Sequence, residues 1–308
     1  MKLEVQGWLM LDKPEGISSA AALNKIKKFV KPDKIGHAGT LDPFASGLLM
    51  VAVGKATKLI QYSMAQEKTY KFSIKWGVST DSIDPTGNIV ATSCDRPKIS
   101  QIIEFISSNH GMILQEPPIY SAININGRRA YDIARSGVDF SIESRPVNIK
   151  ELKLLSHTKE ESEFFLRCGK GFYVRSLVRD IAKYCSVYGY TSKLRRTSVG
   201  NFTVENAISV DYILEKVKCR EDVAALLIKP YSVLEGMSIY IASHEEIKLI
   251  RHGRKIRAKA VNSIAENCEV AVHDNLNGEL IGICIQTGGY LHPKKILSTL
   301  NAEAYREI

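Results

Sequence analysis

The sequence predicts an α+β fold in two domains, a larger N-terminal one and a small β-rich one at the C-terminus. Its 308 residues exceed the roughly 150 that one domain usually takes. Strand-like and helix-like patterns alternate up to about residue 230. Beyond it, short apolar runs are broken by Gly253, Asn277-Gly278 and Gly288-Gly289. We therefore expect domains at 1–233 and 234–308.

The composition is that of a soluble globular protein, with 44% hydrophobic and 24% charged residues. No apolar run approaches the roughly 20 residues of a membrane-spanning helix. The N-terminal sequence MKLEVQGWLMLDKPEG is charged and lacks the apolar core and cleavage site of a signal peptide. We expect a cytoplasmic protein with no membrane contact.

The cysteines and histidines form no pattern that binds metal. None of the six cysteines lies in a C-x-x-C pair, and the seven histidines are scattered. A disulfide framework is also not typical of a chain of this length. We expect reduced thiols and no metal.

Positive charge is concentrated in two segments of a chain whose net charge is +9. Residues 1–75 contain twelve lysines against six acidic residues, and residues 165–196 contain eight basic residues against one aspartate. Acidic and basic residues balance from 232 to the end. A localised excess is typical of a nucleic-acid footprint, but a merely soluble basic surface would give the same count.

The first strands and the first helix have clear sequence patterns. Residues 7–12 (GWLMLD) and the run LLMVAVG from residue 48 are typical of buried strands. A helix is expected over 18–30 with Ser18 or Ser19 as its N-cap. The segment 35–48 has neither period and is predicted to be a loop.

Residues 68–77 (KTYKFSIKWG) give the clearest strand pattern, a strict alternation with period 2. One face takes Tyr70, Phe72, Ile74 and Trp76. The other takes Lys71, Ser73 and Lys75. Further strands are expected near 147–157 and 163–168.

Two more helices and an excursion from the core complete the N-terminal domain. Helices are expected at 99–108 and 174–188, the second with Arg175, Arg179 and Lys183 on one stripe. Residues 116–146 contain the turn signal Asn126-Gly127. The arginines of this excursion are Arg128, Arg129, Arg135 and Arg145.

Nucleotide-cofactor motifs are not supported. The stretch 54–57 (GKAT) invites a P-loop reading, but Leu49 and Ala56 stand where that motif needs glycine and Ser or Thr. Gly169-Lys170-Gly171 lacks the third glycine of a dinucleotide fingerprint.

Asp42 and the window 169–180 (GKGFYVRSLVRD) are the stronger candidates for function. Asp42 lies in a Gly-rich loop whose backbone can approach a ligand closely. A turn aspartate bonding its own backbone is the alternative, and a lone His37 is more often structural. Likewise, 169–180 could be an ordinary strand-to-helix turn, and Leu194-Arg195-Arg196 a solvated charge run.

Together, the motifs resemble the bacterial TruB family, the tRNA pseudouridine-55 synthases. They occur in family order over about residues 1–205: Lys13-Pro14, 36–43 (GHAGTLDP), 54–58 (GKATK), 68–70 (KTY), 81–87 (DSIDPTG), 117–122 (PPIYSA), 171–176 (GFYVRS) and 194–197 (LRRT). One departure is Asn124, where the family often has lysine.

The resemblance implies a pseudouridine synthase catalytic domain with a mixed, largely antiparallel central sheet flanked by helices. It also implies a PUA-like RNA-binding domain at 234–308 and an RNA-gripping insertion at 116–146. The expected activity is isomerisation of uridine to pseudouridine in the T loop of tRNA. We expect it to need no cofactor or metal and to be carried out by a monomer.

The resemblance also implies roles for individual residues. Asp42 would be the catalytic carboxylate, paired with Arg175 because a guanidinium opposes the rise in pKa that burial causes. Tyr70 would stack on the flipped base, Tyr173 would move the C5 proton, and Leu194 would close the apolar wall. His37 would help to extrude the base, and Asp84 would hold its loop or contact the nucleotide. The phosphate candidates are Lys13, Lys58, Arg128, Arg129, Arg135 and Arg179.

Three other classes of protein bind RNA or act on its bases. A non-catalytic tRNA-binding protein or RNA chaperone with a synthase-like fold fits the charge pattern equally well, but binding alone has no use for a buried carboxylate facing RNA. A glycosylase would release free uracil. A zinc deaminase is excluded because its H-x-E and P-C-x-x-C motifs are missing.

Overall fold

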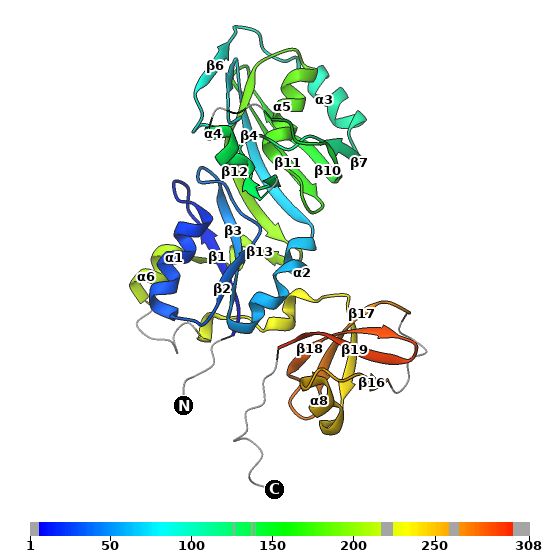
Figure 1. Cartoon of the computed structure of the whole chain (residues 1–308). Coiled ribbons are helices and arrows are strands. Elements are labelled where there is room, and N and C mark those ends of the chain that lie inside the picture. The colour runs from blue at the N-terminus through cyan, green and yellow to red at the C-terminus, as the bar shows by residue number, and fades with distance from the viewer. Residues whose placement is uncertain are drawn as a thin grey trace.

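A long mixed sheet forms the larger part of the molecule, and a second, five-stranded sheet follows it (Figure 1). The computed structural model describes residues 6–125, 127–136, 138, 140–216, 224–258 and 265–297, without the side chains of residues 29, 30, 135 and 216. Within these residues no helix is both long and apolar enough to cross a membrane.

The large sheet has ten strands, and most neighbours are antiparallel. Its main order is β14 (Ile208–Ser209), β1 (Gly7–Lys13), β3 (Ser46–Val53), β12 (Gly189–Val199), β4 (Lys68–Trp76), β11 (Glu161–Cys168), β10 (Arg145–His157) and β7 (Gly111–Gln115). Strand β2 (Ile35–Ala38) pairs with β3, and β13 (Phe202–Thr203) pairs with β12. The β1–β14 and β3–β12 pairs are parallel. The expected mixed, largely antiparallel sheet is confirmed.

Helices and short hairpins surround this sheet. The helices are α1 (Ser19–Val30), α2 (Ile60–Ala65), α3 (Ile99–Ser108), α4 (Ala130–Arg135), α5 (Val174–Tyr184) and α6 (Val210–Lys216). The 3-10 turns are η1 (Gly54–Leu59), η2 (Val204–Asn206) and η3 (Pro230–Val233). The hairpins are β5 (Val78–Thr80) with β6 (Ile89–Thr92), and β8 (Asn124–Ile125) with β9 (Arg128–Arg129).

The C-terminal sheet has the order β15 (Ser238–Ala242), β17 (Glu269–Asp274), β18 (Leu280–Thr287), β19 (Tyr290–Ile296) and β16 (Ile256–Arg257). Helix α8 (His244–Arg251) accompanies it, and Ser243 and Glu246 form a capping box at its start. This strand-rich, curled sheet confirms the expected β-rich C-terminal part.

The sequence located most elements, and its errors have local causes. Ser18 caps α1 by accepting from the Ala21 N–H at 3.1 Å. The expected loop at 35–48 is shorter, because 35–38 pair with β3 and β3 already begins at residue 46. Helix α5 ends at Tyr184 rather than at 188, since Ser186 adopts a left-handed φ of 54°.

Strand β4 lies between β12 and β11 and turns its aromatic face to the main core. Tyr70, Phe72, Ile74 and Trp76 are buried there, as the alternation predicts. Ser73 on the opposite face is also buried, which the alternation does not predict. It stands in register between Glu163 and Lys193, and two long side chains cover a small one.

A second core joins the two sheets. Trp8, Leu48 and Met50 belong to the same buried cluster as Val233, Ala271 and Ile283. Strand β1 is also tied to the segment before β15, because the Trp8 indole donates to the Pro230 carbonyl at 3.0 Å. The two sheets therefore share apolar packing.

Gly47 offers a test of the β3–β12 junction. It has a φ of +104°, and an added Cβ would lie 2.2 Å from the Arg196 carbonyl oxygen. We expect Gly47→Ala to lower the free energy of unfolding by at least 3 kcal/mol, because overpacking adds to the backbone strain. Urea denaturation measures this.

Gly16→Ala is the matched control. Gly16 also has a positive φ, +83°, but nothing lies within 4 Å of an added Cβ. It should lose about 1 kcal/mol from backbone strain alone. Equal losses in the two variants would contradict the close approach at Gly47.

Candidate active site

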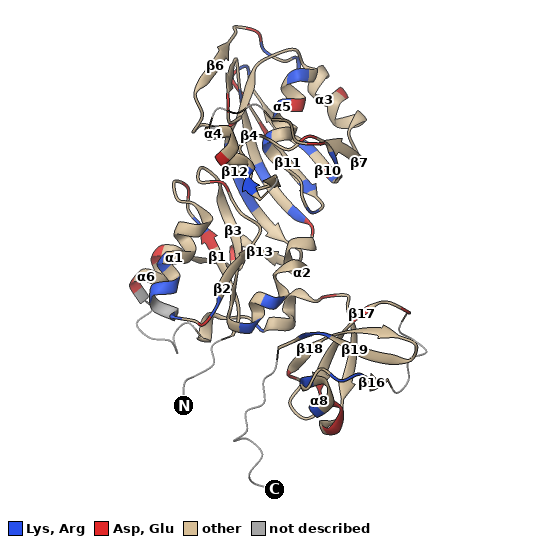
Figure 2. Ribbon diagram, in the orientation of Figure 1, with Lys and Arg blue, Asp and Glu red and all other residues tan. Residues whose placement is uncertain are grey.

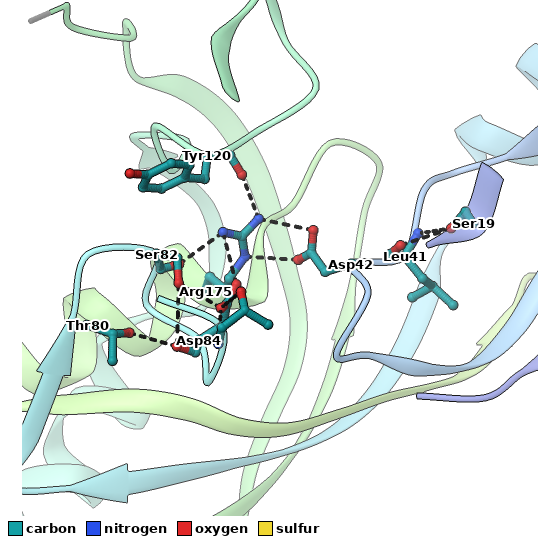
Figure 3. Close-up of polar contacts among 9 residues, drawn as sticks. Ser19, Leu41, Asp42, Thr80, Ser82, Asp84, Tyr120 and Arg175 are labelled. Carbon is teal, nitrogen blue, oxygen red and sulfur yellow. Dashed lines mark hydrogen bonds and ion pairs between the residues drawn. The ribbon is translucent and has the colours of Figure 1, made fainter. Parts of the chain in front are cut away.

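Asp42 lies in a loop between β2 and β3, residues 39–45, called the Asp42 loop below (Figure 3). Ser19, at the start of α1, bonds to both backbone groups of Leu41: its hydroxyl donates to the carbonyl and accepts from the N–H, each at 2.9 Å. The Ala45 N–H donates to the Asp42 carbonyl at 3.1 Å. The backbone on both sides of Asp42 is therefore fixed.

Lys13 supports the same loop from β1. Its ammonium donates to the carbonyls of Pro14 and Ile17 at 2.8 Å and of Pro43 at 3.5 Å, and the side chain is fully buried. Burial lowers the pKa of Lys13 to about 8, although the Asp42 charge opposes this. The expectation that Lys13 contacts a phosphate is corrected: a lysine with no exposed surface holds the chain instead.

Arg175 is the centre of the site (Figure 3). Its Nε lies 2.9 Å from Asp42 Oδ2, and its Nη2 donates to Asp42 Oδ1 at 3.2 Å. Nη2 also donates to the Tyr120 carbonyl at 2.8 Å. Nη1 donates to the Ser82 carbonyl at 3.0 Å and lies 3.5 Å from Asp84 Oδ2. Five contacts thus match the five N–H donors of a guanidinium.

The first turn of α5 directs Arg175 inward. Tyr173 is the N-cap residue, with extended φ and ψ of −114° and 116°. The buried Gln115 amide accepts from the Tyr173 N–H at 2.9 Å and donates to its carbonyl at 3.1 Å. Arg175 is 4% exposed, so the first member of the stripe Arg175, Arg179 and Lys183 faces the protein interior, where its expected partner Asp42 lies.

The Asp42 carboxylate remains accessible beside this buried cation. A third of its side chain, 33%, is exposed, against 4% for Arg175. The pKa of Asp42 is raised: burial is the largest cause, Arg175 opposes it, and the Asp84 charge adds to it. The guanidinium therefore moderates the effect of burial without reversing it.

Asp84 is buried within its own loop. Its Oδ1 accepts from the Ser82 hydroxyl at 2.7 Å, and from the Thr86 hydroxyl and N–H at 2.6 and 2.9 Å. Its other oxygen faces Arg175. These contacts favour the loop-holding role among the two expected for Asp84.

Two apolar candidates lie in the same cluster as Leu41. Tyr70 is 8% and Leu194 6% exposed, and both pack in the main core with Leu41. Burial raises the pKa of Tyr70, and the Arg196 charge opposes that rise. The Asp42 charge acts on the Tyr70 hydroxyl, so the fold brings the expected stacking residue near the Asp42 loop.

Tyr173, the N-cap residue of α5, and His37, on β2, are both half-buried. The Arg145 guanidinium lies 5.2 Å from the centre of the Tyr173 ring. His37 Nε2 is 3.1 Å from the Thr40 hydroxyl. The pKa of His37 is lowered, first by burial and then by the Arg196 charge.

The expected phosphate residues are dispersed. Lys58 donates to the Ile296 carbonyl of β19, against the C-terminal sheet. Arg128 and Arg129 are exposed on β9, and Arg129 donates to the Ala122 carbonyl at 2.6 Å. Arg135 ends α4, but its side chain lies outside the described part. Arg179 lies 3.0 Å from Asp180 and 3.9 Å from Glu116.

The basic segment 165–196 is less available than its charge suggests. Figure 2 shows its basic residues on β11, α5 and β12. Arg175 and Arg196 are buried, and Arg195 forms a two-point pair with Asp12 at 2.8 and 3.0 Å. Arg167 and Arg179 also face acidic side chains. Five of the eight basic residues are therefore engaged within the protein.

Several contributors were not found from the sequence. The carbonyls of Ser82 and Tyr120 bind Arg175, and the side chains of Ser19 and Gln115 fix the backbone nearby. A carbonyl has no sequence signal, because every residue has one. Among the described residues, no group of three His, Cys, Asp or Glu side chains could hold a metal ion.

Known proteins resemble this chain over nearly its whole length. A profile described as "TruB family pseudouridylate synthase (N terminal domain)" matches residues 27–174. The "tRNA pseudouridine synthase B" of Ehrlichia ruminantium (strain Gardel) is 36% identical over 95% of this chain and 99% of its own. That of Bartonella tribocorum (strain CIP 105476 / IBS 506) is 37% identical over 96% of each.

Solved structures show the same fold at lower identity. A chain of a "Cbf5-Nop10-Gar1 Complex" superposes with a TM-score of 0.72 at 23% identity, over 97% of this chain and 87% of the other. A chain of an "H/ACA RNP bound to a substrate RNA containing 2'-deoxyuridine" gives 0.70 at 22%, over 95% and 85%. On the sequence matches, this chain belongs to the TruB family of pseudouridylate synthases.

Proposed function

We propose that this protein is a tRNA pseudouridine synthase that isomerises the uridine at position 55 in the T loop. The observation that supports it most is the Asp42 carboxylate, accessible to a ligand and held at both oxygens by a saturated Arg175. Its relatives named tRNA pseudouridine synthase B supply the substrate class.

The reaction rearranges one nucleoside without a net redox change. The C1′–N1 bond breaks and N1 takes up a proton. C1′ then joins C5, and C5 releases its proton to water. An ionised carboxylate at the sugar can act in this sequence, and Asp42 is fixed for that task from α1, β1 and α5.

Base flipping requires a platform for the extruded uridine. Unstacking costs a few kcal/mol, and base–aromatic stacking returns about 1–3 kcal/mol. We assign the platform to Tyr70 and the apolar wall to Leu194, which pack with Leu41. Tyr173 and His37 keep their assigned roles in proton movement and base extrusion.

RNA contacts beyond the active site follow the exposed cations. We assign Arg128 and Arg129 on the 116–146 insertion as phosphate contacts, since both are exposed. We also assign the C-terminal sheet, in a PUA-like domain from residue 234, to the T arm of tRNA. Phosphate contacts orient an RNA without reading its sequence, so the arm's shape supplies selectivity.

The protein is further proposed to act as a cytoplasmic monomer. The contacts among Asp42, Arg175 and Asp84 form within one chain, which supports a site built by a single copy. Sedimentation with and without tRNA tests this.

A non-catalytic RNA chaperone is the alternative. It has no use for an accessible carboxylate, because an anion facing RNA phosphates weakens binding. In such a protein, Asp42 would weaken RNA binding and would have no catalytic role.

Tritium release separates these functions. With a T-arm RNA tritiated at uridine C5, the wild-type protein should release tritium to water, and Asp42→Ala should release none. The variant's RNA affinity should stay within about threefold, since no binding contact to phosphate is lost. Turnover by Asp42→Ala would overturn the assignment of Asp42, and free uracil in the products would indicate a glycosylase.

Tyr70 variants test the platform. Tyr70→Ala should slow single-turnover release by roughly 10- to 100-fold, because the base loses 1–3 kcal/mol of stacking. Tyr70→Phe keeps the ring and should lose less than about tenfold. Equal losses in the two variants would favour a role for the hydroxyl over stacking.

The pH–rate profile tests the charge environment of Asp42. The reaction needs ionised Asp42, so activity falls as pH drops through its raised pKa. Removing the negative charge of Asp84 lowers that pKa, and Asp84→Asn should therefore move the acid limb to lower pH, whatever its maximal rate. Asp81→Asn in the same loop is the control, since Asp81 bonds to Asn88 and should leave the limb in place.

A further inference from the structure

Arg196 is a buried arginine with an unusual set of partners. It lies on β12 next to Arg195, and consecutive strand residues face opposite sides. Arg195 faces outward to Asp12, whereas Arg196 is 2% exposed. The reading of 194–196 as a solvated charge run is therefore wrong for Arg196.

The Arg196 guanidinium bonds to neutral groups. Nε donates to the Leu48 carbonyl at 2.7 Å and Nη2 to the Gly39 carbonyl at 3.0 Å. Tyr70, its register partner on β4, is the neighbouring side chain on the same face of the sheet. Among the described residues no carboxylate forms an ion pair with it, in contrast to Arg175 with two. Burying a charge that is stabilised only by neutral dipoles costs free energy. The positions of its partners indicate what the Arg196 side chain contributes.

The two carbonyls that Arg196 binds lie at the two ends of the Asp42 loop. Gly39 is the first residue of the Asp42 loop, and Leu48 follows the loop's end by three positions. One side chain thus joins the two ends of the loop. The Arg196 backbone adds to this, because it packs directly on Gly47, which it faces in register.

Arg196 is also next to Tyr70, the residue assigned as the stacking platform for the base. Arg196 and Tyr70 are register partners on β12 and β4. The side chain that holds the loop ends therefore also lies beside the Tyr70 side chain. Its position sets the separation between the Tyr70 ring and the Asp42 loop.

We infer that Arg196 is a positioning residue, which fixes the Asp42 loop relative to the Tyr70 ring so that a flipped uridine meets Asp42 in reacting geometry. It does not contact the substrate, because it is buried behind both. This inference rests on the proposed function.

Three variants test it: Arg196→Lys, Arg196→Met and the control Arg195→Met, which removes the same charge one residue away on the opposite face. Arg196→Met should slow single-turnover tritium release by about 100-fold, since misplacement by about 1 Å costs that much. Arg196→Lys keeps the charge but lacks the planar fork that reaches the Leu48 and Gly39 carbonyls together, and should lose on the order of tenfold. Arg195→Met should stay near the wild type.

The affinity for tRNA separates positioning from folding. All folded variants should bind tRNA within about threefold of the wild type, because Arg196 reaches no phosphate. Wild-type rates in both Arg196 variants, or losses that only follow weaker tRNA binding, would overturn the inference. If Arg196→Met does not fold, Arg196→Lys provides the measurement.

Hydrogen exchange gives a readout that does not need the reaction. The N–H groups of Leu41 and Ala45 are bonded within the Asp42 loop region and should exchange faster in Arg196→Lys than in Arg195→Met. Unchanged exchange would overturn the positioning role. A different result would be faster exchange in Arg196→Lys together with no tritium release by the wild-type protein. That result would contradict the proposed function but would support the contact of Arg196 with the Asp42 loop.

Discussion

The contact of Arg175 with Asp42 is the interaction on which the site depends. A lone carboxylate this near the core would favour its neutral form, and a lone guanidinium 4% exposed would be strongly disfavoured. Each therefore makes the other possible. Because Asp84, Ser82 and Tyr120 occupy the remaining donors, the guanidinium has no freedom to turn. Because all the N–H donors of Arg175 have partners, the guanidinium fixes the direction of the Asp42 carboxylate.

The Asp42 loop shows how a short irregular segment becomes rigid. Ser19 and Lys13 hold its backbone, and the Arg196 guanidinium bonds near both ends. These residues come from α1, β1 and β12, which are far apart in sequence. Preorganisation of this kind is what positions a reacting group before the substrate arrives.

Local sequence patterns predicted the elements where pattern and packing agree. The alternation from Tyr70 to Trp76 gave β4, and Ser18 gave the start of α1. Asp42 and Arg175 were found through motifs that resemble a family, not through periodicity. What failed were the expectations for Lys13 and Arg196 as surface cations. Their burial depends on carbonyls supplied by segments that are distant in sequence, and neither composition nor a local pattern predicts such contacts.

The core shared between the two sheets has a consequence for synthesis on the ribosome. Trp8 is made more than two hundred residues before its partners Ile228 and Pro230, and earlier still than Ala271 and Ile283 of the same cluster. Strand β1 also pairs with β14, some two hundred positions later. Strand β1 must therefore wait, incompletely covered, until these later segments have emerged. Such late closure of long-range contacts slows folding and prolongs the exposure of apolar surface to other nascent chains.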